Sequence, residues 1–153
     1  MKPKGISPKK EKGQSLVEFA VSFVVIVMIL VAVADFGRAF FTWLAMRDAA
    51  QEGAVYGSIC PNSLANIEAR ARSSSRWPVD LSNPDITVTC ELLGSSNATC
   101  GTVMAIPGSG IRLTVLHTNF QLTTPLLGSL LGSQTIPIRA TVTDTILRNN
   151  NCP

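Results

Sequence analysis

Residues 13–34 of the chain read GQSLVEFAVSFVVIVMILVAVA, and Glu18 is the one charged residue among them. The nineteen residues from Leu16 to Ala34 are otherwise almost entirely apolar. As an α-helix this run is roughly 28 Å long at about 1.5 Å per residue, close to the ~30 Å hydrocarbon core of a bilayer. The sequence therefore predicts one membrane-spanning helix near the N-terminus.

The charges on the two sides of this run are unequal. All five lysines of the 153-residue chain precede residue 13, and Glu11 is the only acid there, so the leader (residues 1–13) carries a formal charge of +4. From Gln14 onward eight arginines stand against nine acidic residues. Because positive charge is retained on the cytoplasmic side of a membrane, we expect a cytoplasmic N-terminus and an exported C-terminal domain.

Two other interpretations of the apolar run compete with a permanent anchor. A buried core helix is disfavoured, because a chain this short has too little material to surround a segment of that length. A cleaved secretory signal is the stronger alternative, since Ala32-Val33-Ala34 has the A-x-A pattern of a cleavage site. Against it, Glu18 interrupts the run near its start and the helical pattern continues beyond residue 34.

The continuation of that pattern predicts a much longer helix. No proline occurs between Pro8 and Pro61, and aromatic and then small residues recur at helical spacing. We expect one helix over residues 14–57, of which residues 16–34 span the membrane and residues 35–57 form an amphipathic extension.

Gly13 separates the basic leader from the apolar run, and Glu18 is the fifth residue counted from Gln14. This arrangement resembles the processing site of type IV pilin-like proteins, in which a prepilin peptidase cuts after the glycine on the cytoplasmic side. The cut would remove the positive leader and expose an α-amino group at Gln14. Glu18 would then neutralise an amine during assembly, because a lone carboxylate at the centre of a membrane helix costs about 2.5–3.5 kcal/mol. Taken alone, Glu18 equally fits an acid stabilised near a helix N-terminus.

Three stretches together resemble the TadE-like family of tight-adherence (Tad/Flp) pilus systems. They are GQSLVEFA at residues 13–20, DFGRA at residues 35–39 and AAQEGA at residues 49–54. The resemblance implies a pilin-like minor subunit or pseudopilin whose partners are membrane lipid, a prepilin peptidase, other pilin-like subunits and the pilus assembly platform. Within the second stretch, the i,i+3 spacing predicts an ion pair between Asp35 and Arg38 at the outer membrane boundary.

The exported domain, residues 58–153, shows the period-two alternation of strands with one buried face. The expected elements are a polar helix over residues 61–75, strands over residues 86–92, 102–106, 111–115 and 136–142, and a short helix opened by Thr124-Pro125 and ended by Gly132. A turn at residues 107–110 is expected to pair the second and third strands. The predicted fold class is α+β: a long helix with a small antiparallel sheet packed on its exported half, a pilin-like arrangement.

Four cysteines lie in the exported part, at positions 60, 90, 100 and 152. No pair has C-x-x-C spacing, which argues against zinc and redox motifs. Two disulfides are the natural prediction outside the cytoplasm, with three possible connectivities. We favour Cys90 with Cys100, which closes a loop between strands, and Cys60 with Cys152, which ties the end of the long helix to the C-terminus; free buried thiols are the alternative.

The composition excludes several classes of function. Charged residues make up only 15% and apolar residues 46% of the chain, which disfavours disorder and nucleic-acid binding. Arg70, Arg72 and Arg76 are expected on a solvated helix face rather than on a phosphate-binding surface. His117 is the only histidine, and the spacing of acids and cysteines arranges no catalytic or metal set around it. We expect no enzyme activity, cofactor or metal.

The favoured interpretation is therefore a single-pass protein of the bacterial cytoplasmic membrane that acts by assembly into, or for, an adhesive surface pilus. The alternative is an exported binding domain, either released by cleavage after Ala34 or anchored without any cleavage.

Overall fold

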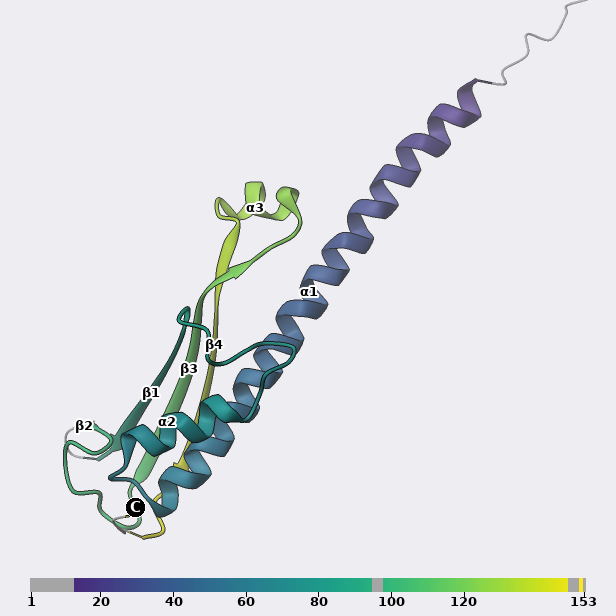
Figure 1. Ribbon diagram of the computed structural model, residues 1–153. Helices are drawn as coiled ribbons and strands as arrows, with labels where there is room; N and C mark the ends of the chain where they lie inside the picture. The colour runs from purple at the N-terminus through teal and green to yellow at the C-terminus, as the bar shows by residue number, and fades with distance from the viewer. Residues whose placement is uncertain (1–12, 95–97, 149–151, 153) are drawn as a thin grey trace, which may run out of the picture.

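A long helix and a four-stranded antiparallel sheet make up the fold in the computed structural model, which describes residues 13–94, 98–148 and 152 (Figure 1). Residues 1–12 of the expected leader lie outside the described part. The α+β class predicted from the sequence is confirmed.

Helix α1 runs unbroken over Gln14–Ile59, a length of 46 residues. Gly13 is its N-cap, and the backbone N–H of Cys60 closes its end by donating to the carbonyl of Tyr56 at 3.0 Å. Pro61 follows, and the residue before a proline is sterically biased away from the helical conformation. The helix therefore extends two residues beyond the expected end at residue 57.

The C-terminal half of α1 packs against the sheet and against helix α2 (Leu64–Ser73) (Figure 1). Most of the α1 side chains that become buried here are small: Ala49, Ala50, Gly53, Ala54, Gly57 and Ser58. They allow a close approach, since a Cβ atom at Gly57 would lie 2.5 Å from Cδ1 of Ile111. Small residues on the helix and branched residues on the strands thus fit together as one core.

The sheet consists of β1 (Ile86–Leu93), β2 (Ala98–Thr99), β3 (Gly110–Gln121) and β4 (Thr135–Thr145), in the order β2-β1-β3-β4. In β1, buried and exposed residues alternate along almost the whole strand, as the period-two pattern predicted. The strands expected over residues 86–92, 111–115 and 136–142 correspond to β1, β3 and β4. Strand β3 is longer at both ends than its alternating stretch.

The strand expected over residues 102–106 was wrong. The second strand is instead the short β2, which pairs with β1 through Glu91↔Thr99 and Leu92↔Ala98. Cys100 is bonded to Cys90 and is followed by Gly101 at a φ of 79°, so the chain turns away from the sheet before residue 102. Of residues 102–106 only Ala105 is buried. The turn at residues 107–110 therefore leads into β3 without joining two paired strands.

Helix α2 is shorter than expected, and its arginines differ in their surroundings. Arg70 is exposed and pairs with Glu52 of α1 at 2.8 Å. Arg72 is half-buried and donates from Nη1 to the backbone carbonyls of Leu81 and Ile86, at 2.7 and 3.2 Å. The expectation of a wholly solvated arginine face was therefore wrong for Arg72, which fixes the loop between α2 and β1.

The connection between β3 and β4 contains the expected short helix, α3 (Pro125–Leu131). Thr124 is its N-cap, and Gly132 ends it at a φ of 73°, a left-handed conformation that glycine adopts freely. In Figure 1, α3 forms the tip of the β3–β4 hairpin, beside α1 and beyond the rest of the sheet.

Candidate membrane and assembly surface

The N-terminal half of α1 extends away from the domain and is not covered by any described part of the chain (Figure 1). Its large apolar side chains are exposed, with Leu16 70% and Leu30 62% accessible. This segment is long and apolar enough to cross a membrane. An isolated apolar helix of this size in water is unfavourable, so its surface needs lipid or other apolar helices as a neighbour.

The residues expected to be processed lie at the N-terminal end of this helix. A Cβ atom at Gly13 would meet no atom within 4 Å, so no described side chain packs against this residue. The side chain of Gln14 donates from Nε2 to Oε1 of Glu18 at 3.2 Å. The two residues are therefore one helical turn apart on the same face, and Glu18 is exposed.

Aromatic side chains continue the exposed apolar surface beyond residue 34. Phe36, Phe40 and Trp43 recur at intervals of four and three residues and are 72%, 48% and 38% exposed. The Arg47 guanidinium lies 6.0 Å from the centroid of the Trp43 ring. Their spacing continues through Arg47 to Ala50 and Ala54, so they lie along the same stripe of α1 as part of the core but remain exposed. Their surface is therefore available to a neighbour.

Asp35 joins the helix to the sheet. Its carboxylate is 2% exposed and accepts hydrogen bonds from the backbone N–H groups of Thr123 and Thr124, at 3.2 and 2.7 Å, and from the hydroxyl of Thr124. The Thr124 hydroxyl bond is the largest contribution that lowers the pKa of Asp35 to about 2, and the backbone and Thr123 bonds add to it against the opposing effect of burial. The carboxylate is therefore ionised and fixed between two elements that are far apart in the chain.

Arg38 stands one turn above Asp35 and completes this contact. Its Nη1 lies 3.5 Å from Oδ1 of Asp35 and also donates to the hydroxyl of Thr123. The guanidinium lies 5.6 Å from the centroid of the Phe120 ring. The irregularity in β3 between His117 and Phe120 places the Phe120 side chain against α1. The ion pair expected at i,i+3 spacing is thus one part of a larger contact with the β3–β4 connection, which the sequence did not predict.

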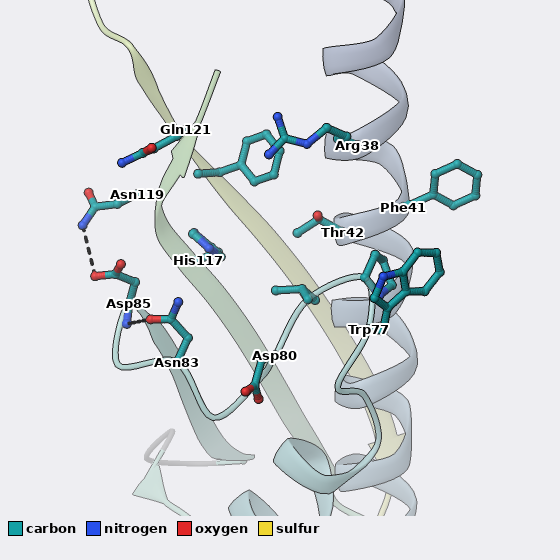
Figure 2. A pocket seen from close by; sticks show the side chains of 13 residues that line it. Arg38, Phe41, Thr42, Trp77, Asp80, Asn83, Asp85, His117, Asn119 and Gln121 are labelled. Carbon is teal, nitrogen blue, oxygen red and sulfur yellow. Dashed lines mark hydrogen bonds between the residues drawn. The ribbon is translucent and has the colours of Figure 1, made fainter. Parts of the chain in front are cut away.

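A cavity of about 710 Å³ lies beside Arg38, between α1, the loop after α2 and the end of β3 (Figure 2). His117 is 8% exposed, and its Nδ1 has no hydrogen-bond partner within the described part of the chain. The two carboxylates that line the cavity stabilise the loop between α2 and β1. Asp85 accepts a hydrogen bond from the side chain of Asn119 at 3.3 Å, and Asp80 accepts one from the backbone N–H of Ser82 at 2.9 Å. Among the described residues, no three His, Cys, Asp or Glu side chains group together as a metal site.

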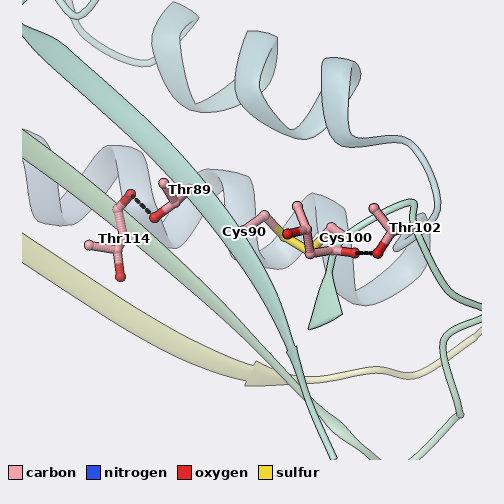
Figure 3. The surroundings of a disulfide bond; sticks show 6 residues. Thr89, Cys90, Cys100, Thr102 and Thr114 are labelled. Atoms are coloured by element: carbon pink, nitrogen blue, oxygen red, sulfur yellow. Dashed lines mark hydrogen bonds between the residues drawn. A yellow bond between two sulfur atoms is a disulfide. The ribbon is translucent and has the colours of Figure 1, made fainter. Parts of the chain in front are cut away.

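Two disulfides close the end of the domain that is far from the apolar half of α1. Cys60, directly after α1, is bonded to Cys152, and Cys90 of β1 is bonded to Cys100 (Figure 3). These are the two pairs favoured from the sequence. Beside the first bond, the backbone N–H of Leu147 donates to the carbonyl of Ser58 at 2.8 Å. The segment after β4 is therefore attached to the end of α1 by both covalent and hydrogen bonds.

Comparison with known proteins identifies the long helix but not the domain attached to it. The model of the TadE-like protein family matches residues 13–55. The resemblance expected from the sequence is thus confirmed over that range, which begins at the glycine before α1 and ends among the small residues of the core. Neither the curated proteins nor the solved structures contain a significant match to this chain.

Proposed function

We propose that the protein is a pilin-like minor subunit or pseudopilin of a tight-adherence pilus, processed by a prepilin peptidase between Gly13 and Gln14. One observation carries this proposal: a single unbroken helix is exposed and apolar in its first half and built into the core of a domain in its second. Such a helix would hold the subunit in the cytoplasmic membrane first. It would later pack against the helices of other subunits.

Each proposed step has its own residues. The basic leader would keep the N-terminus in the cytoplasm and the domain outside. After the cut, the new α-amino group at Gln14 would lie one turn from Glu18, whose carboxylate could neutralise it or the corresponding amine of a neighbouring subunit. The exposed aromatics Phe36, Phe40 and Trp43 would extend the helix–helix contact above the membrane. No step requires catalysis or a cofactor from this chain.

A leucine substitution tests the processing step. Gly13→Leu should block removal of the leader in a host that has the peptidase, while Gly37→Leu should leave it unaffected. The pair is matched, because a Cβ atom at either glycine of this helix region would meet no atom within 4 Å. Complete removal of the leader from the Gly13→Leu protein would contradict the mechanism.

The assembly step has a separate test. Glu18→Gln keeps the size of the side chain and removes its charge, so the variant should be processed normally but fail to enter or support pili. Glu68→Gln, in α2, is the control and should assemble like the unmodified protein. Normal pili with Glu18→Gln would overturn the assembly role of the carboxylate without affecting the processing proposal.

A further inference from the structure

The connection between β3 and β4 (residues 122–134) lies at the end of the domain that is nearest to the apolar half of α1. Strand β3 follows α1 in the antiparallel sense. Ile111 meets α1 at Gly57, Leu113 meets it at Gly53, and Phe120 lies below the Arg38 guanidinium. The chain thus advances along α1 toward the span, and residues 122–134 form the end of that path (Figure 1).

The hydrogen bonds of Asp35 fix the height of this connection. Asp35 is the first residue after the apolar run of residues 16–34, and it holds the backbone of Thr123 and Thr124. Helix α3 starts at the next residue, Pro125. The headgroup layer of a bilayer adds about 5–8 Å on each side of the hydrocarbon core. If residues 16–34 span that core, α3 lies within the headgroup layer or at its inner edge.

The composition of this segment fits such a place. Residues 122–138 contain no charged side chain, and five of the ten residues from 122 to 131 are leucine. Leu127 is half-buried and packs against the core, whereas Leu131 is 59% exposed. An uncharged, leucine-rich segment of this kind suits the boundary between headgroups and acyl chains.

We propose that the β3–β4 tip, residues 122–134, is a second lipid-contacting element, which rests on the outer leaflet beside α1 and sets the height and tilt of the domain above the membrane. The inference rests on the proposed function in one respect, namely that residues 16–34 cross the bilayer. The partner is the lipid surface itself, because Asp35 holds Thr123 and Thr124 at the level where the span ends and residues 122–138 carry no charge that would oppose contact with lipid.

Fluorescence quenching in vesicles tests this contact. The full chain with one added cysteine, Leu131→Cys, is labelled with an environment-sensitive fluorophore and reconstituted into phosphatidylcholine–phosphatidylglycerol vesicles. The native cysteines are paired, so the unsubstituted chain should take up no label. Thr143→Cys is the matched control, an exposed position on β4 that pairs with Arg112 at the far end of the sheet. Val25→Cys, in the middle of the apolar run, reports whether α1 spans.

The label at residue 131 should lose about half of its emission to shallow nitroxide lipids, as expected for a depth of about 5–10 Å at the headgroup boundary. The label at residue 143 should respond only to an aqueous quencher. Equal aqueous quenching at residues 131 and 143, with residue 25 quenched by lipid, would overturn this inference alone. Absence of lipid quenching at residue 25 would overturn the membrane anchor as well. Protection of residue 131 that disappears at one copy per vesicle would assign the contact to a second copy, and would also overturn the inference.

Discussion

The carboxylate of Asp35 accepts hydrogen bonds from both the backbone N–H and the hydroxyl of Thr124, a residue 89 positions further along the chain. Asp35 belongs to the long helix and Thr124 caps α3 at the tip of the sheet. This pair sets the relation between the apolar half of α1 and the domain. The domain is therefore fixed at a defined position along α1 instead of hanging from a flexible linker.

Replacement of Asp35 by asparagine should destabilise the domain. The variant keeps the side-chain size but loses the charge, and its amide nitrogen faces a donor at Thr124. Hydrogen bonds to charged groups contribute about 1.5–3 kcal/mol each, so we expect a loss of unfolding free energy in that range. Urea denaturation of the detergent-solubilised protein measures it.

Asp48→Asn is the control for this substitution, since Asp48 is an exposed aspartate on the same helix. It should change the unfolding free energy by less than about 0.5 kcal/mol. A similar loss of unfolding free energy in the two variants would contradict the structural role of Asp35.

The stability of the domain should depend on this carboxylate at low pH. The folded-state pKa of Asp35 is lowered from 3.8 to about 2, chiefly by the hydroxyl of Thr124. A lowered folded pKa contributes stability that is fully present above the unfolded pKa and is lost as the pH falls through the folded pKa. Between about pH 4 and pH 2 the unmodified protein should therefore lose more unfolding free energy than Asp35→Asn. Parallel pH profiles for the two proteins would contradict this.

Two glycines of α1 should respond in opposite ways to alanine. A Cβ atom at Gly53 would overlap Cδ2 of Leu113, a residue with no exposed surface, and would lie 3.1 Å from Cβ of Ala71. Overpacking of this kind costs about 1–3 kcal/mol. A Cβ atom at Gly37 meets nothing within 4 Å, so alanine there should be neutral or raise helix stability by up to about 1 kcal/mol.

Thermal unfolding of the two alanine variants provides the comparison. Equal melting temperatures for Gly53→Ala and Gly37→Ala would mean that α1 and the sheet do not pack as closely as the structure has them.

The bond between Cys60 and Cys152 should stabilise the domain more than its place near the C-terminus suggests. It links residues 92 positions apart, and loop closure of that length is worth about 4–5 kcal/mol at most in the chain-entropy model. The double variant Cys60→Ala, Cys152→Ala should therefore unfold at markedly lower urea concentration. A midpoint equal to that of the unmodified protein under oxidising conditions would show that the bond contributes nothing.

The helix and the main strands could be predicted from the sequence because their signals are local. The apolar run, the absence of proline up to Pro61 and the alternation in β1, β3 and β4 all act over a few residues. The strand expected over residues 102–106 failed because apolar letters alone do not reveal a chain that turns away at Gly101.

The contacts that assemble the domain are not local and left no such signal. Asp35 and Arg38 are conspicuous as a pair in the sequence, but nothing near them points to Thr124. The core uses the small residues of α1 from Ala49 to Gly57, because they allow the sheet to approach closely, whereas Phe36, Phe40 and Trp43 stay exposed. Both the partner of Asp35 and the core residues of α1 are determined by packing between segments that are far apart in the chain.

The most direct test of the central claim is the intact mass of the protein isolated from its native membranes. Processing of a pilin-like subunit predicts a chain that begins at Gln14 and has lost all five lysines of the leader. A mature chain that begins at Asp35 would identify a released domain, and a chain that still begins at Met1 would identify a static anchor. Either of these two results would contradict the proposed function.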